Sequence, residues 1–218
     1  MTSLTLQGIL SEPDQPADSC LILLHGLGAS GHDFEAVLPY FRHGIQHSLR
    51  CIFPHSPERA VTINQGMKMP AWYDFALDGQ LRTVNQAHLE ESVAAVRDII
   101  AGQIEQGINP KRIILAGFSQ GGAVAYEAAL QHSTELAGVL ALSTYLPNDV
   151  SQKLNDFPIL AIHGEQDDVV PLKLGEDSAR LLKSVGYSVD WKTYPMGHEM
   201  CLEEIEYVNQ TINKLLDN

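Results

Sequence analysis

Short, almost uninterrupted apolar runs recur along the chain and predict buried strands. They span residues 20–24, 113–116, 139–142 and 159–162. Runs of about four to six residues without polar alternation are typical of strands buried on both faces, as in a parallel sheet covered by helices. Residues 187–194 instead alternate between apolar and polar side chains, which predicts a strand nearer the edge of the sheet.

Segments with helical period lie between these strands. In residues 87–106 the apolar side chains recur at positions i, i+4, i+7 and i+11, and the Asn109–Pro110 pair marks the end of the segment. Residues 201–215 repeat the pattern. Strands that alternate with helices over the whole length predict an α/β fold with a doubly wound, mostly parallel sheet. The length allows one domain, so we expect residues 1–218 to form a single domain.

One stretch, residues 54–86, shows neither period. It contains three prolines, which are Pro54, Pro57 and Pro70. A loop of about 30 residues inside a compact domain is unusual and is more often functional than idle. We interpret the stretch as a flap-like loop that partly covers one end of the sheet.

Composition and charge exclude several function classes. The chain is 44% hydrophobic, which is ordinary for a globular protein, but 14 Lys and Arg stand against 27 Asp and Glu and give a net charge of −13. A surface this acidic repels nucleic-acid phosphates and anionic lipid headgroups, and the sequence contains no run of Lys and Arg that could form a local basic patch. The longest apolar run, residues 20–24, is far below the ~20 residues of a membrane span. We expect no nucleic-acid partner and no stable membrane insertion.

The N-terminal residues and the cysteines indicate the compartment. Residues 1–16 carry acidic side chains but no Lys or Arg, which is not typical of a signal peptide. Cys20, Cys51 and Cys201 are too few and too scattered for a disulfide framework, and no Cys/His cluster has metal-ligand spacing. We therefore expect a cytoplasmic protein with reduced cysteines and no metal site.

The segment Gly117–Gly121 (GFSQG) carries the strongest chemical signal. It follows the apolar run of residues 113–116 and precedes an Ala-rich segment, residues 122–130, that is able to form a helix. In such a strand–turn–helix a serine is held on a tight turn with its hydroxyl exposed above the sheet, and the flanking glycines avoid a clash between helix and strand. Ser119 is therefore a candidate nucleophile. The alternative is a serine that caps a helix at a Gly-rich turn.

A serine nucleophile needs a base and a third group that orients the base, and candidates for both follow along the chain. Residues 163–171 (HGEQDDVVP) form an acidic turn after a predicted buried strand, with Asp167 and Asp168 as candidate acids. His198 follows the alternating strand. Because functional groups of open α/β sheets lie at the carboxyl ends of the strands, we expect the three segments to meet at one edge of the sheet.

A glycine-rich loop, residues 24–31 (LHGLGASG), follows the first predicted strand. Acyl transfer develops negative charge on the carbonyl oxygen, and fixed N–H donors stabilise that charge. We expect one donor from the backbone of Gln120, directly after the nucleophile, and the other from Leu27 in this loop. A phosphate-binding loop is the competing interpretation. However, no Lys-Ser/Thr pair follows, and residues 49–54 lack the acidic residue of a dinucleotide site.

Several motifs together resemble the carboxylesterase / acyl-protein thioesterase family, also called the phospholipase/carboxylesterase family. They are LHGLGASG, MPAWYDF at residues 69–75, GFSQGG at residues 117–122, the acidic turn and the Gly-His-Glu of residues 197–199. The resemblance implies an α/β-hydrolase fold without a separate cap domain, no cofactor and a possible homodimer. It also implies that Ser119 is the nucleophile, Asp167 the acid of the triad and His198 the base.

The same resemblance marks residues 67–73 as a wall of an acyl-binding groove, with Met67, Met69 and Trp72 as substrate-binding residues. Each buried CH₂ contributes about 0.8 kcal/mol, so such a groove favours apolar acyl chains. Because the acidic surface opposes anionic lipid, we expect a serine carboxylesterase that hydrolyses small, short-to-medium-chain esters. The alternatives are an acyl-protein thioesterase or a lysophospholipase with the same triad and, more remotely, a non-catalytic binding protein on a hydrolase fold.

Overall fold

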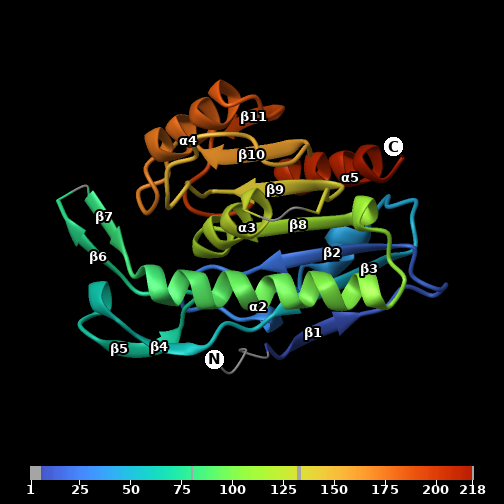
Figure 1. The fold of residues 1–218 in the computed structure, drawn as a ribbon, viewed down its shortest axis with the longest axis horizontal. Coiled ribbons are helices and arrows are strands. Elements are labelled where there is room, and N and C mark those ends of the chain that lie inside the picture. Colours follow the sequence, from blue (N-terminus) through green and yellow to red (C-terminus); the bar gives the residue numbers. More distant parts are fainter. Residues whose placement is uncertain (1–5, 80, 132–133, 218) are drawn as a thin grey trace.

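A seven-stranded sheet runs through the centre of the molecule (Figure 1). The computed structural model describes residues 6–79, 81–131 and 134–217. Neighbouring strands are parallel except for β1 and β3, so the sheet is mostly parallel, as the apolar runs predict. In spatial order the strands are β1 (Gly8–Ser11), β3 (Leu49–Pro54), β2 (Ser19–Leu24), β8 (Ile113–Phe118), β9 (Gly138–Leu142), β10 (Ile159–Gly164) and β11 (Val189–Tyr194).

Helices cover both faces of this sheet, with α2, α3 and α4 on one face and α1 and α5 on the other (Figure 1). The helices are α1 (Leu38–Arg42), α2 (Gln86–Glu105), α3 (Gln120–Leu130), α4 (Leu172–Ser184) and α5 (Leu202–Leu216), with short 3₁₀ helices η1 (Gly31–Phe34), η2 (Thr62–Asn64) and η3 (Pro110–Arg112). Along β2, Ile22 and Leu24 belong to the core under α2 and α3, whereas Leu21 and Leu23 belong to the core under α5. A strand with two buried faces has few polar positions, which explains the nearly uninterrupted apolar runs.

The predicted strands and helices agree with the structure. The apolar runs form β2, β8, β9 and β10, and the alternating segment forms β11 at the edge of the sheet. The two segments of helical period form α2 and α5, and the Ala-rich segment forms α3. No helix in the described residues has the length and apolar character that a membrane span requires. β3 was not among the predictions, because Arg50 interrupts its apolar residues.

Residues 54–86, which we interpret from the sequence as a flap-like loop, contain two antiparallel hairpins. They pair β4 (Glu58–Val61) with β5 (Met67–Pro70) and β6 (Phe75–Asp78) with β7 (Leu81–Val84). Each strand has only 4 residues, which is too short for a sustained alternation in the sequence. Figure 1 shows both hairpins beside the carboxyl ends of the parallel strands.

The strand order indicates where a ligand-binding site lies in this sheet. β2 lies between β3 and β8, so the chain leaves β2 on one side and returns on the other. In open α/β sheets, ligands bind outside the carboxyl ends of the strands at such a switch point. Leu24, the last residue of β2, pairs with Gly117 of β8. The sheet itself therefore places the glycine-rich loop next to the turn that carries Ser119.

Candidate active site

Ser119 occupies a strained turn between β8 and α3. Its φ of 55° lies in the left-handed region, which a residue with a side chain adopts only at a cost. Neighbouring groups hold it there, because the Ser119 amide donates to the carbonyl of Leu142 at 2.9 Å and the Thr144 hydroxyl donates to the Ser119 carbonyl at 2.7 Å. The Ser119 hydroxyl lines a cavity above the sheet. This geometry is typical of a nucleophile elbow.

The glycines on either side of Ser119 permit this turn. A Cβ atom on Gly117 would lie 2.4 Å from the backbone carbon of Gly121, and one on Gly121 would lie 2.4 Å from the carbonyl oxygen of Leu24. Real Cβ atoms do not approach backbone so closely. The structure therefore agrees with the close helix–strand contact that the sequence motif predicts, and it does not match an ordinary helix cap, since Ser119 makes no side-chain capping bond to α3.

Three residues that lie far apart in the sequence meet above the sheet. The Nε2 atom of His198 lies 2.8 Å from the hydroxyl oxygen of Ser119, and its Nδ1 atom lies 2.7 Å from Oδ2 of Asp167. Both distances are those of hydrogen bonds. Since an ionised carboxylate only accepts, Nδ1–H donates to Asp167 and leaves Nε2 free to accept the serine proton. The structure thus brings together the nucleophile, base and acid named from the sequence.

Asp167, rather than Asp168, contacts the imidazole. The Oδ1 atom of Asp167 accepts hydrogen bonds from the backbone amides of Val169 at 2.9 Å and Val170 at 2.7 Å, which leaves Oδ2 for His198. Asp167 is buried, whereas Asp168 is exposed. Adjacent side chains in a turn point in different directions, and only one of these two carboxylates is aimed at the histidine.

Another histidine, His163, is buried and contacts the turn that carries Asp167. Nε2 of His163 lies 2.8 Å from the carbonyl oxygen of Val170 and 3.4 Å from Oδ2 of Asp167. Burial lowers the pKa of His163, which favours the neutral ring with an N–H on Nε2. That N–H donates to the turn that carries Asp167. His163 therefore has the structural environment expected of a bracing residue.

The two residues predicted to supply oxyanion donors line the same cavity as Ser119. Leu27 and Gln120 both line it. As the first residue of α3, Gln120 has an amide N–H without an intrahelical partner, and the helix dipole adds positive potential there. The loop that carries Leu27 is anchored by the amide of Gly28, which donates to the carbonyl of Pro70 at 2.8 Å. Both predicted donors are thus held by backbone structure at the rim of the cavity.

His25 braces the glycine-rich loop. The amide of Ser56 donates to Nε2 of His25 at 3.1 Å, so the proton of the neutral ring is on Nδ1, which lies 2.7 Å from the carbonyl oxygen of Gly26. Burial lowers the pKa of His25 and favours this neutral form. The indole N–H of Trp72 donates to the carbonyl of His25 at 2.8 Å. These contacts fit loop bracing rather than acid–base work.

The side chain of Gln120 makes contacts that the sequence analysis missed. Its Oε1 accepts from the amide of Trp72 at 2.8 Å, and its Nε2 donates to the carbonyl of Tyr73 at 2.7 Å. A single buried amide thus joins the nucleophile turn to the segment between the two hairpins. The signal available in the sequence was a long polar residue inside an otherwise small and apolar motif.

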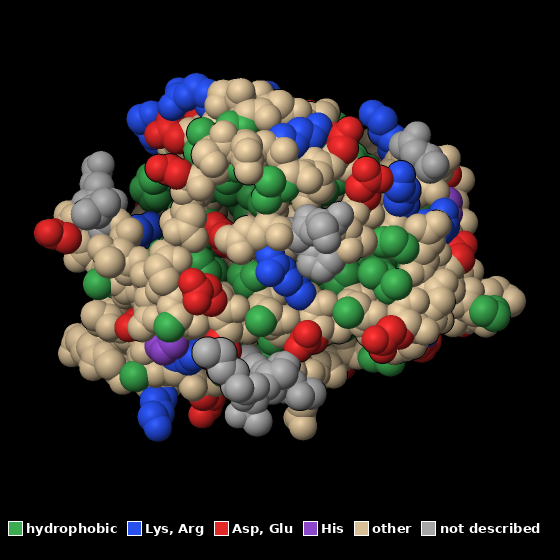
Figure 2. Space-filling model, in the orientation of Figure 1, with side chains coloured by type: hydrophobic (Ala, Val, Ile, Leu, Met, Phe, Trp, Pro, Cys, Tyr) green, Lys and Arg blue, Asp and Glu red, His purple; other side chains and the backbone are tan. Residues whose placement is uncertain are grey.

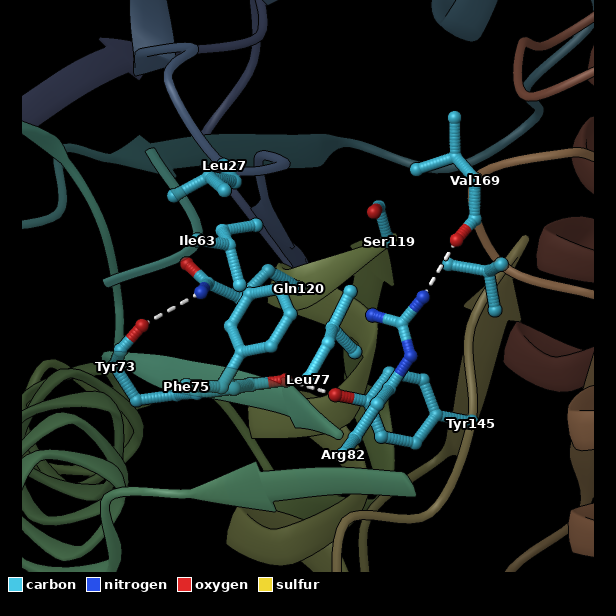
Figure 3. A pocket seen from close by; sticks show the side chains of 11 residues that line it. Leu27, Ile63, Tyr73, Phe75, Leu77, Arg82, Ser119, Gln120, Tyr145 and Val169 are labelled. Carbon is cyan, nitrogen blue, oxygen red and sulfur yellow. Dashed lines mark hydrogen bonds between the residues drawn. The ribbon is translucent and has the colours of Figure 1, made fainter. Parts of the chain in front are cut away.

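A cavity of about 160 Å³ opens beside Ser119 (Figure 3). Apolar side chains make up most of its lining, and the β6–β7 hairpin contributes two of them, Phe75 and Leu77. The full set of apolar lining residues is Leu27, Ile63, Tyr73, Phe75, Leu77, Tyr145, Val169 and Val170. Arg82 of β7 is the charged residue among the lining residues.

The three side chains expected to bind substrate lie outside this cavity. Trp72 is fully buried, and its indole N–H is occupied by His25. Met67 is 64% exposed on β5, and neither it nor Met69 lines the cavity. From the β4–β5 hairpin it is Ile63 of η2 that lines the cavity, and the β6–β7 hairpin contributes more of the wall. In the described part of the chain, no cluster of His, Cys, Asp and Glu is arranged to hold a metal ion.

Known proteins are similar to this chain in sequence and in fold. Residues 8–216 match the family model described as Phospholipase/Carboxylesterase. The chain is 36% identical over 214 residues to acyl-protein thioesterase 1 of Gibberella zeae, with 90% of both chains covered. It is 38% identical over 213 residues to acyl-protein thioesterase 1 of Neurospora crassa, with 90% of this chain and 86% of the relative covered. The crystal structure of Arabidopsis thaliana SOBER1 is similar with a TM-score of 0.83 and 28% identity, covering 91% of this chain and 99% of that one. The resemblance found in the motifs is confirmed.

Proposed function

Because the chain belongs to the phospholipase/carboxylesterase family of α/β-hydrolases and is therefore a hydrolase of esters or thioesters, we propose that Ser119, His198 and Asp167 form its catalytic triad. The observation that carries the proposal is the continuous contact from Asp167 through His198 to Ser119, at 2.7 Å and 2.8 Å. An open apolar cavity beside the serine hydroxyl provides space for an acyl group.

In the proposed reaction the Ser119 oxygen attacks the acyl carbonyl while His198 removes its proton. Negative charge develops on the carbonyl oxygen, where the backbone N–H groups of Leu27 and Gln120 stabilise it. His198 then donates the proton to the leaving alcohol or thiol, and an acyl-enzyme on Ser119 remains. Water, activated by the same histidine, attacks the acyl-enzyme and releases the carboxylic acid. Asp167 keeps the imidazole in the required tautomer throughout.

The size of the cavity supports a short-to-medium acyl chain. An apolar cavity of about 150 Å³ accommodates benzene, and the cavity beside Ser119 has a similar volume of about 160 Å³. We therefore propose substrates whose acyl group has about six carbon atoms inside the cavity. The same triad chemistry applies to an oxygen ester and to a thioester. The names of the fungal relatives favour S-acylated protein cysteines as a second candidate substrate.

A fluorophosphonate probe tests the nucleophile. We expect it to label the wild type and the Ser184→Ala variant, in which an exposed helix serine is removed, but not Ser119→Ala. Absence of labelling in the wild type, with the protein folded by circular dichroism, would refute the serine-hydrolase mechanism.

A series of p-nitrophenyl esters from acetate to palmitate, paired with thioesters of the same acyl chains, tests the substrate class. We expect kcat/KM to rise up to about six to eight carbons and then to fall or level off, since each enclosed CH₂ adds about 0.8 kcal/mol. A value still rising at palmitate would overturn the chain-length proposal and would favour a lipid or a long-chain acyl protein as substrate.

A further inference from the structure

One positive charge projects into the otherwise apolar cavity. Arg82 lies on β7, and its guanidinium lines the same cavity as Ser119. In Figure 3 the side chain extends from the hairpin across the cavity toward Val169, on the side where Ser119 lies. Arg82 is half-buried, so the guanidinium has lost part of its contact with water, and an acceptor in the cavity would offset that cost. Arg82 therefore requires an explanation that the proposed ester hydrolysis does not supply.

The guanidinium is held in one position by three contacts. Its Cζ atom lies 5.3 Å from the ring centre of Phe75 and 5.2 Å from that of Tyr145, which are distances of cation–π interactions. Its Nη2 atom donates to the carbonyl of Val169 at 2.5 Å. Two rings and a carbonyl thus orient a planar cation before any ligand arrives, which lowers the entropy cost of binding to it.

No carboxylate of the described residues lies within ion-pair distance of this cation, although the chain carries 27 Asp and Glu. By contrast, Arg50 pairs with Glu12, and Arg59 pairs with Glu91. The Val169 carbonyl takes one of the five N–H groups that a guanidinium carries, so donors remain for another acceptor. A carboxylate matches the planar fork of arginine better than any neutral group does.

We propose that Arg82 recognises a carboxylate at the far end of the acyl chain, so that the preferred substrates are half-esters or half-thioesters of short dicarboxylic acids. This inference rests on the proposed function of Ser119. The scissile carbonyl lies at the serine, the methylene groups contact Leu27 and Phe75, and the terminal carboxylate pairs with Arg82. A cavity for about six carbon atoms fits an acyl group such as adipyl. The acidic surface repels larger anionic assemblies but leaves this local cation available to a small anion.

The test compares two p-nitrophenyl esters of equal chain length, the hexanoate and the mono-adipate. We expect the wild type to have a kcat/KM at least ~10-fold higher for the mono-adipate. Arg82→Gln removes this preference while it still hydrolyses the hexanoate, and Arg82→Lys keeps part of it. Lys68→Gln is the matched control, because it removes the same charge from an exposed position on the neighbouring hairpin. It changes the ratio less than about twofold.

A second readout uses free adipate as an inhibitor of hexanoate hydrolysis. We expect competitive inhibition of the wild type and of Lys68→Gln, with hexanoate ester as substrate, and at least ~10-fold weaker inhibition of Arg82→Gln. If neither ester is hydrolysed, the proposed function fails. If the hexanoate is hydrolysed but the mono-adipate is not preferred, or if Arg82→Gln lowers both rates equally, Arg82 only holds the hairpin against Val169 and the inference of anion recognition is overturned.

Discussion

The floor of the site, formed by β2, β8 and the start of α3, is buried almost completely, whereas its wall, the two hairpins of residues 58–84, exposes large apolar side chains. In the floor, a single methyl group at Gly121 would collide with backbone at 2.4 Å. In the wall, Met67 is 64% exposed and Leu77 is 50% exposed. A rigid floor suits chemistry that depends on distances of a few tenths of an ångström, and an exposed wall suits adjustment to different substrates.

Two polar links join the wall to the rest of the site. The amide of Gln120 binds the backbone of Trp72 and Tyr73, and the guanidinium of Arg82 binds the carbonyl of Val169. The first link is buried at the base of the wall, and the second lies near its tip. On the face of the molecule in Figure 2, basic side chains are scattered among acidic ones, so this face carries no broad basic surface. Because Ser119 stands in the floor and the wall lines the cavity, changes in the floor should affect turnover most, and changes in the wall should affect selectivity.

The largest expected effect is on the acid of the proposed triad. Asp167→Asn changes the group that orients His198 and stabilises its positive charge, and the corresponding change in another serine hydrolase lowers turnover by ~10⁴-fold. We expect a loss of several orders of magnitude in kcat. Asp168→Asn is the matched control, and its kcat should fall less than roughly tenfold because Asp168 is exposed. The opposite ranking of the two variants in steady-state assays would contradict the assignment of Asp167.

Outside the floor and the wall, a buried carboxyl at the start of α5 makes part of the stability of the fold depend on pH. Glu204 is fully buried, and neither carboxyl oxygen has a hydrogen-bond partner among the described residues. Burial raises the pKa of Glu204 from its usual 4.5 to about 8. Its pKa in the folded state thus exceeds that in the unfolded state, so the stability that this group contributes is fully present below about pH 4.5 and is lost as the pH rises through about 8.

Replacing this carboxyl tests that dependence. We expect the free energy of unfolding of the wild type to fall by a few kcal/mol between about pH 5 and pH 8 through this group. Glu204→Gln should remove that part of the slope in urea titrations at the two pH values. Glu203→Gln, at an exposed neighbouring position, should leave the slope in place. An unchanged slope in Glu204→Gln would show that the carboxyl is not the group responsible.

The link at the base of the wall should show an intermediate effect. Gln120→Met keeps the length of the side chain but removes both hydrogen bonds to residues 72 and 73, which leaves a buried amide and a carbonyl unpaired. We expect kcat/KM for a hexanoyl ester to fall about 10- to 100-fold. Gln210→Met, on the exposed side of α5, is the control and should retain full activity. Wild-type kinetics in Gln120→Met would show that the wall needs no such anchor.

The smallest effect is expected at the exposed part of the wall. Leu77 is half exposed at the cavity, so Leu77→Ser removes only part of an apolar contact. We expect KM for a hexanoyl ester to rise by roughly threefold, with kcat and thermal stability almost unchanged. Met67→Ser, outside the cavity, should change KM less than about twofold. A large loss of kcat in Leu77→Ser would remove the distinction between floor and wall.

The local pattern of apolar and polar residues was sufficient to predict most of the strands and the turn that form the floor. Each of β2, β8, β9 and β10 contains a run of at least four apolar residues because both faces of the strand are buried, and such a run can be recognised from a few neighbouring residues. The turn at Ser119 is equally local, since its glycines and serine stand within one five-residue motif. Asp167 could be chosen over Asp168 only through the family resemblance, because the neighbouring residues in the sequence do not determine the direction of a side chain in a turn.

Tertiary structure alone decided the wall and what it contacts. The hairpins of residues 58–84 have strands too short for a period, and their stability depends on packing against the loops of the sheet. The family resemblance implied that Trp72 binds substrate, yet folding buries it against His25 and brings Arg82, 37 positions before Ser119, into the cavity instead. Contacts between residues so distant along the chain follow from how layers pack in space, and no periodicity of apolar and polar positions records them.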